Sequence, residues 1–225
     1  LSAYWYPFRE FVSLSPPSRG NNFLADSRFE DAIALYRFDR NFKLLLLDAV
    51  ERIEIATRAE IALLLGSRDV FAHTNQTLLH TRFLSPNKNG DVPYQKWLDK
   101  FDGMVARSTD EFILHHERKY GSRSPLPIWI AIELWDFGLL SHFYSGMKIK
   151  DRERIAARFL IPDWRLMESW LRCLNYIRNV IAHHGRAWNM NLVNNPRLPQ
   201  SAGIMPSFDS LLPHLSAAGT RIYSM

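Results

Sequence analysis

Apolar residues recur at helical spacing along most of this chain. Ser27 and Glu30 form a capping-box pattern, and the apolar period that follows predicts a helix ending near Phe38. Asp39 is then expected to cap a second, longer helix, which carries leucine and isoleucine to a stop at Gly66. The first part of the chain therefore predicts two consecutive helices.

The middle of the chain continues the helical pattern with several breaks. Residues 67–91 are weakly helical and end in a loop, and Pro93 begins a helix that we expect to reach Gly121. A linker at 122–127 precedes another helix, which Gly138 is expected to interrupt. No segment shows the apolar and polar alternation of a strand, so the fold class predicted here is all-α.

Two helices and a tail complete the predicted order. Asp151 begins a short helix ending near Leu160, and Pro162–Asp163 starts a final amphipathic helix. Residues 190–225 break the period with asparagine, proline and glycine, and only 208–215 could form a short helix. We expect residues 1–225 to form a single domain, a helical bundle with an irregular, extended C-terminal tail.

Composition supports one compact core. The chain has 225 residues, 47% of them hydrophobic and 13% aromatic, which is ample for a buried core. No apolar run approaches the length of a membrane span, so no membrane association is expected. The single cysteine, Cys173, excludes an intramolecular disulfide and favours a reducing, cytoplasmic location. No signal-peptide pattern occurs, and because the sequence begins at Leu1 rather than Met, we expect an N-terminal segment to be missing.

Positive charge is concentrated in the last third of the chain. The formal net charge is +5, and residues 151–225 contribute +4 of it, with nine arginines, no lysine and five acidic residues. Arginine pairs bidentately with phosphate, so this bias favours a phosphate-bearing partner. The alternative is that the arginines are simply exposed to water on helix faces and bind no partner.

The end of the final helix carries an unusual group of polar residues. They are Arg178, Asn179, His183, His184 and Arg186. Asn179 and His183 are four residues apart and share a face, whereas Arg178 lies roughly 140° from His183 on a continuous helix. Two arrangements would bring Arg178 and His183 to one atom: the helix opens after Ala182 toward Gly185, expected to be a left-handed cap, or a second copy supplies the partner.

Other parts of the sequence offer weaker candidates. Glu51, Glu54 and Arg58 form a stripe on the long helix that is either a surface salt bridge or the wall of a polar cleft. The adjacent histidines of His115–His116 and His183–His184 diverge on a helix and lack the i,i+4 spacing of a zinc site. Neither a phosphate-binding glycine loop nor a nucleophile elbow occurs, so no metal and no cofactor are expected.

Several separated motifs resemble one known family when taken together. They are Leu1–Phe8, Leu35–Asp39, Ala49–Arg58, Trp129 with Glu133, Phe137–Gly138 with Ser141, and Arg178–Asn179 through Trp188–Asn189. In this order they resemble the Abi-like (abortive infection) family, which is related to the HEPN superfamily of helical ribonucleases. The resemblance covers most of residues 1–190.

The resemblance implies a function and a site. The HEPN signature of arginine, a polar residue, a short spacer and histidine carries over to Arg178, Asn179 and His183. It implies metal-independent cleavage of RNA, in phage defence or as a toxin, at a composite site where two protomers of a homodimer meet. Within that pattern we favour a catalytic role for His183 over simple contact with the free carbonyls at a helix end.

The chemistry of RNA cleavage gives each residue a role. Without a metal, cleavage needs a base for the 2′-hydroxyl, an acid for the leaving oxygen and a cation at the phosphate, and it leaves a 2′,3′-cyclic phosphate. Histidine suits the proton transfers, and Arg178 would supply the charge. His184, Arg186 and Arg172 are candidates for RNA binding, and Glu51, Glu54 and Arg58 for support.

A non-catalytic alternative stays open. The chain could be an RNA-binding or antitoxin-like module that keeps the fold and the basic face. A regulatory small RNA or a neighbouring protein is a further expected partner in either case.

Overall fold

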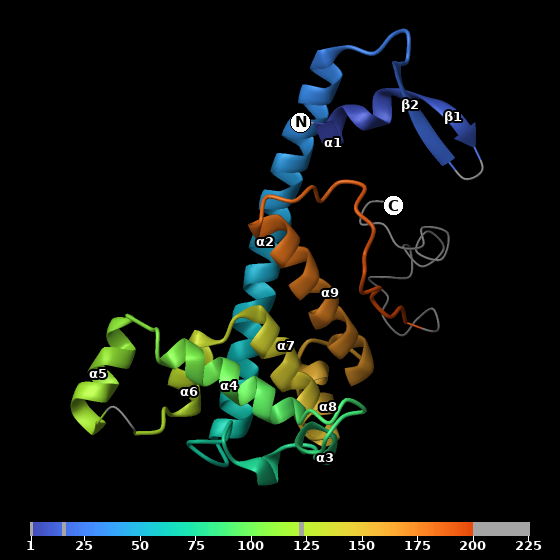
Figure 1. Cartoon of the computed structure of the whole chain (residues 1–225). Coiled ribbons are helices and arrows are strands. Elements are labelled where there is room, and N and C mark those ends of the chain that lie inside the picture. Colours follow the sequence, from blue (N-terminus) through green and yellow to red (C-terminus); the bar gives the residue numbers. More distant parts are fainter. Residues whose placement is uncertain (1, 15–16, 122–123, 200–225) are drawn as a thin grey trace.

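The computed structural model describes residues 2–14, 17–121 and 124–199 (Figure 1). The short helix expected at 208–215, and most of the expected tail, lie outside the described residues. Within the described part, helices dominate and only one small sheet occurs, which confirms the all-α class as a mostly helical bundle. No described helix combines the length and the apolar character needed to cross a membrane.

The long helix α2 runs without a break from Phe29 to Gly66. The two helices expected here are therefore one, and the prediction that Asp39 caps the second was wrong. Asp39 is fully buried inside α2, on the same stripe as Ala32 and Val50. Its carboxylate accepts hydrogen bonds from other parts of the chain and does not cap a helix. The start of α2 also differs from the expected capping box, because the Arg28 N–H donates to Asp31 Oδ2 at 3.0 Å.

The N-terminal segment contains strands that the sequence pattern did not predict. The helical turns α1 (Ser2–Trp5) and η1 (Tyr6–Phe8) lead into an antiparallel hairpin, β1 (Arg9–Leu14) and β2 (Pro17–Phe23). Two irregularities interrupt its register, between Arg9 and Phe11 and between Phe11 and Ser13. Because each bulge shifts the alternation of faces, no clean period-two pattern survives in the sequence.

The remaining helices are η2 (Gln76–Leu78), α3 (Thr81–Leu84), α4 (Pro93–Val105), α5 (Glu111–Tyr120), α6 (Ile128–Ala131), η3 (Ile132–Leu134), α7 (Phe137–Gly146), α8 (Ile149–Arg158) and α9 (Trp164–Ala182). Most of them lie around the second half of α2, and α5 stands farther out, beyond α4 and α6 (Figure 1).

Two expected boundaries are corrected. The helix expected from Pro93 to Gly121 is divided into α4 and α5, and at the break Ser108 Oγ donates to the Asp110 carboxylate at 2.8 Å. Gly138 interrupts nothing, because it lies in the first turn of α7, which Asp136 caps.

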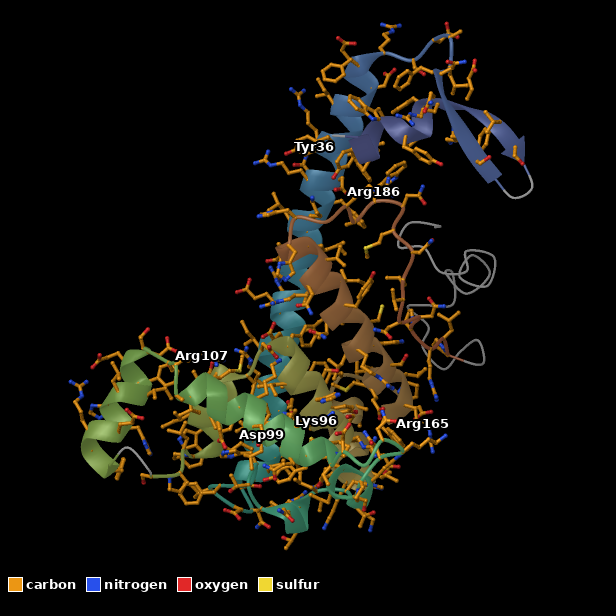
Figure 2. The ribbon with its side chains drawn as sticks, viewed as in Figure 1. Tyr36, Lys96, Asp99, Arg107, Arg165 and Arg186 are labelled. Atoms are coloured by element: carbon orange, nitrogen blue, oxygen red, sulfur yellow. The ribbon has the colours of Figure 1, made fainter. Side chains whose placement is uncertain are left out.

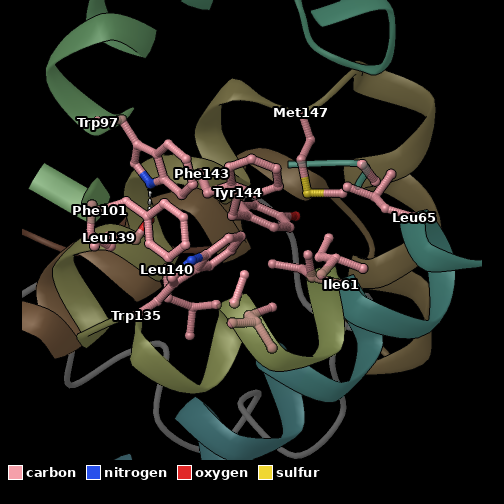
Figure 3. Packing of buried hydrophobic residues seen from close by; sticks show 14 of the residues in the cluster. Ile61, Leu65, Trp97, Phe101, Trp135, Leu139, Leu140, Phe143, Tyr144 and Met147 are labelled. Carbon is pink, nitrogen blue, oxygen red and sulfur yellow. Dashed lines mark hydrogen bonds between the residues drawn. The ribbon is translucent and has the colours of Figure 1, made fainter. Parts of the chain in front are cut away.

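Aromatic side chains build the centre of the core (Figure 3). Trp97 and Trp135 meet edge to face with ring centroids 5.0 Å apart, and Phe143 lies 4.6 Å from Trp135. The Trp97 indole N–H donates to the Leu139 carbonyl at 3.0 Å, so its one polar group is satisfied. This cluster holds α4 and α7 together beside α2, and α7 in turn packs against α9.

Candidate functional site

The amphipathic helix α9 positions the polar group predicted from the sequence. Asp163 caps its first turn by accepting the Arg165 N–H at 2.8 Å, as expected. Near the other end, Cys173, Ile177 and Ile181 pack with Phe42 of α2 in a second, smaller apolar cluster. This packing fixes the rotation of α9, and so decides which side chains of the motif face solvent.

The end of α9 is a Schellman turn. The helix ends at Ala182, the Gly185 N–H donates to the Val180 carbonyl at 2.8 Å, and the His184 N–H donates to the Ile181 carbonyl at 2.9 Å. The left-handed residue is His184, with φ 59°, so the prediction that Gly185 takes this conformation was wrong.

Gly185 is required for another reason. A Cβ at this position would lie 2.8 Å from the Val180 carbonyl oxygen and 2.6 Å from a Val180 methyl group. The glycine therefore permits the close approach that closes the turn.

Asp39 of α2 fixes the chain that follows this turn. Its Oδ1 accepts the N–H groups of Ala187 at 3.0 Å and Trp188 at 2.5 Å. Its Oδ2 accepts the Tyr4 hydroxyl at 2.7 Å and lies 3.2 Å from Lys43 Nζ. One buried carboxylate thus joins α1, α2 and the motif segment.

Arg186 turns away from the helix end toward the N-terminal segment. Its Nη1 donates to the Ala3 carbonyl at 2.8 Å, and its guanidinium lies 5.7 Å from the centre of the Trp188 ring. In Figure 2 Arg186 lies beside α1, at the opposite end of α9 from Arg165. The structure therefore shows Arg186 bracing the N-terminal segment.

Arg178 is half-buried, and its charge acts on two carboxylates, Glu54 of α2 and Asp136, which caps α7. Its Nη1 donates to Asn179 Oδ1 at 3.4 Å. Burial raises the pKa of Glu54, while the positive charges of Arg58 and Arg178 oppose that rise. Burial alone would also raise the pKa of Asp136, but the Lys100 and Leu139 hydrogen bonds and the charges of Lys100 and Arg178 hold it below its usual value. The charge of Arg178 thus acts on both carboxylates, whose ion pairs are with Arg58 and Lys100.

The predicted stripe on α2 is a half-buried ion pair. Arg58 Nη2 lies 2.5 Å from Glu54 Oε1 and donates to the Trp135 carbonyl at 2.5 Å, and its Nη1 lies 3.8 Å from Glu133. Arg58 therefore joins α2 to the turn before α7. Glu51 is exposed. The salt bridge expected on this stripe forms between Glu54 and Arg58, and the polar cleft stays a prediction.

Asn179 and His183 are exposed, and they continue a polar face along α9. Asn179 and His183 follow Arg172 by seven and eleven residues, so on a regular helix each projects within about 20° of Arg172, and the two lie about 40° from each other. Asn179 Nδ2 donates to Asn175 Oδ1 at 3.5 Å, and Arg172 Nη2 lies 2.9 Å from Glu168. His184, also exposed, follows just beyond this face.

One protomer does not bring Arg178 and His183 together. The helix stays regular through Ala182, so the angular offset between the two positions persists, and within the described residues no hydrogen bond joins them. No group of three or more His, Cys, Asp or Glu side chains in the described ranges is placed to hold a metal ion. What one chain presents is an exposed histidine and an amide on one face, and a half-buried arginine that contacts the amide.

Sequence reasoning missed three residues of this region. Asp39 lies in phase with the buried stripe of α2, and that phase was the signal that it is an interior residue. Asn175 lies four residues before Asn179, the spacing of neighbours on a helix face. Asp136 caps α7 by accepting the Leu139 N–H at 2.7 Å, and no local pattern pairs it with Arg178.

Comparison with known proteins gives one result. A family model described as Abi-like protein matches residues 1–189, which include the whole motif and the N-terminal elements it contacts. No curated protein and no solved structure matches the chain.

Proposed function

The chain belongs to the Abi-like protein family, which is associated with abortive infection in phage defence, and we propose that it acts there, or as a toxin, as a metal-independent endoribonuclease of the HEPN type. The observation that carries the proposal is the end of α9, where His183 is exposed on the same face as Asn179, and Arg178 contacts Asn179 while lying apart from His183. A cytoplasmic location belongs to the same proposal.

Each residue has a role in this reaction. His183 takes the proton from the 2′-hydroxyl or gives one to the leaving 5′-oxygen. Arg178 stabilises the charge that develops on the phosphate, and Asn179 orients the histidine or contacts the phosphate. Arg172 and His184 contact the RNA strand on either side of these groups. Glu54 and Arg58 hold the environment of Arg178 without contacting RNA.

A second copy completes the site. Since one protomer keeps Arg178 and His183 apart, the proposal places the arginine of one chain against the histidine of its partner. Support comes from α2, where the exposed Phe38, Leu45 and Leu63 (53%, 73% and 70%) share one face with the exposed Arg52. Asp39 and Lys43 of the same helix contact the chain just beyond α9, so this face begins at the level of the motif.

The separation within one protomer also favours a second candidate. A chain that stays monomeric would present the basic face without an assembled pair, which suits a non-catalytic RNA-binding or antitoxin-like module. Oligomeric state discriminates the two: light scattering at micromolar concentration should give a homodimer if the composite site forms. A monomer with full nuclease activity would contradict the composite site.

The proposed activity is tested on mixed RNA with and without a chelator. Purified protein should cleave RNA in the presence of EDTA and leave 2′,3′-cyclic phosphate ends, which a cyclic phosphodiesterase converts to a product of altered mobility. Activity that EDTA abolishes and magnesium restores would contradict the mechanism, and binding without cleavage by a dimer would favour the second candidate.

A further inference from the structure

A basic pocket lies at the opposite end of α9 from His183. Its volume is ≈ 670 Å³, and five arginines contribute to its wall: Arg82, Arg152, Arg165, Arg172 and Arg197. Glu168 is the only acidic residue among those that line it, so the lining carries a formal charge of +4 with its histidines neutral. The arginines come from α3, α8, α9 and the chain after α9, so folding alone brings them together.

Internal contacts use part of this charge. Glu168 lies 2.6 Å from Arg152 Nη1 and 2.9 Å from Arg172 Nη2, so it orients two guanidinium groups. Arg82 and Arg197 are exposed, and neither forms an ion pair within the described ranges. The backbone of Arg197 is nonetheless held, because its N–H donates to Ser169 Oγ at 2.8 Å and its carbonyl accepts the Trp170 indole N–H at 2.7 Å. Two cations thus remain unneutralised at a fixed place.

A buried arginine forms the floor. Arg152 is 5% exposed, its Nε–H has no hydrogen-bond partner among the described atoms, and its guanidinium lies 3.8 Å from the centre of the Trp164 ring. Arg165 also lies over that ring, at 4.5 Å. Because Arg152 and Arg165 already lie over the Trp164 ring, a nucleobase has little room to stack there, and the pocket favours a ligand with a high negative charge.

We propose that this pocket binds a terminal phosphate group. A phosphomonoester carries about −1.5 to −2 charge near pH 7 and three acceptor oxygens, whereas a diester inside an RNA strand carries a single charge, so the excess of arginine suits the former. The source is either the 5′-phosphorylated end of an RNA or a free nucleoside polyphosphate. The first source rests on the proposed function, since Arg172 borders the pocket and begins the polar face that leads to His183.

The test measures binding without reference to cleavage. Inorganic pyrophosphate is titrated into the full chain by calorimetry, and the same is done for an Arg82→Ala/Arg197→Ala variant. The control is Arg107→Ala/Lys119→Ala, which removes two exposed cations near α5, on the other side of the body (Figure 2). We expect pyrophosphate to bind the wild type and the control alike, and the pocket variant at least tenfold more weakly. No binding by the wild type, or equal binding by the pocket variant, overturns the proposal.

Two further probes identify the source. A short oligoribonucleotide that binds more tightly with a 5′-phosphate than with a 5′-hydroxyl, a difference lost in the pocket variant, supports the RNA end. Binding of a nucleoside triphosphate with no such difference supports the free nucleotide. His183→Ala should bind pyrophosphate normally, so failure of the nuclease proposal and failure of the pocket are distinguishable.

Discussion

Asp39 and Trp188 are 149 positions apart in the chain, yet the Asp39 carboxylate accepts the Trp188 N–H at 2.5 Å. The same carboxylate binds Tyr4 and Lys43, and it is fully buried. The burial of Tyr4 and its hydrogen bond to Asp39 raise the pKa of the Tyr4 phenol well above its usual value, so the phenol stays a donor at any physiological pH. The chain beyond the α9 motif is therefore held by a carboxylate inside another helix, in the first third of α2.

Asp39→Ala should destabilise the protein strongly. It removes the ion pair with the half-buried Lys43 and leaves two backbone N–H groups and the Tyr4 hydroxyl without this acceptor, for which we expect a loss of about 3–5 kcal/mol in the free energy of unfolding. Asp48→Ala on the same helix is the control, because Asp48 is exposed and its one ion pair among the described residues is with the exposed Arg52, so its loss should be below about 1 kcal/mol. Chemical denaturation measures both, and equal effects would contradict the anchoring role.

His73 should make stability depend on pH. Burial lowers its pKa from 6.5 to about 4, although the Asp69 carboxylate acts in the opposite direction. Between pH 6.5 and 4 the unfolded chain binds a proton at His73 that the folded chain does not. The contribution of His73 to the free energy of unfolding therefore keeps its full value above pH 6.5 and decreases as pH falls toward 4. The full loss is about 3 kcal/mol.

His73→Phe isolates that contribution. The ring lies 5.4 Å from Phe101 in an aromatic environment, so phenylalanine fits with little change in volume. Denaturant titrations at several pH values should show a flatter pH dependence for His73→Phe than for the wild type. The exposed His115→Gln should keep the wild-type slope, and an unchanged slope in His73→Phe would contradict the prediction.

Gly185→Ala should disturb the motif through sterics alone. The added methyl group would meet the Val180 carbonyl at 2.8 Å, so the turn must open, at a cost of about 1–3 kcal/mol. Gly103→Ala is the matched control, because Gly103 lies inside α4 and its Cβ would meet only the end of the Arg107 side chain at 3.5 Å. That variant should gain about 0.5–1 kcal/mol. Thermal unfolding of the two variants should therefore shift in opposite directions, and parallel shifts would contradict the steric account.

The fold class and the last helix were accessible from sequence because their signals are local. Asp163 followed by a strong apolar period predicts α9, and the structure confirms that helix and its cap. The continuity of α2 could not be predicted. In the sequence, a buried Asp39 cannot be distinguished from a capping one, because its partners Tyr4 and Trp188 are distant along the chain. The hairpin was missed because its bulges erase the alternation.

The predicted site divides in the same way. Helical phase predicts that Asn179 and His183 share a face, and both are exposed; it also keeps Arg178 apart from His183, although Arg178 reaches Asn179. The proximity of Arg178 to Glu54 and Asp136 depends on how α2, α7 and α9 pack, and no spacing in the sequence contains that information. The residue with the left-handed conformation is His184 and not the predicted Gly185. Gly185 is a glycine because a Cβ there would clash with Val180, a contact that the sequence does not reveal.

Replacing Arg172 separates backbone contact from chemistry. If Arg172 only tracks the RNA strand, Arg172→Ala should weaken RNA binding and reduce the salt dependence of affinity by about one phosphate contact. Binding measured at several salt concentrations checks this, with Arg107→Ala as the control. An unchanged salt slope would remove Arg172 from the RNA interface.

The most direct measurement of the central claim is single-turnover RNA cleavage by His183→Ala, made in EDTA beside RNA binding at several salt concentrations. If His183 transfers protons, the variant should lose roughly 10²-fold or more in cleavage rate while its RNA affinity stays near that of the wild type. Normal cleavage by His183→Ala with weakened RNA affinity would make His183 a binding residue and contradict the proposed nuclease mechanism.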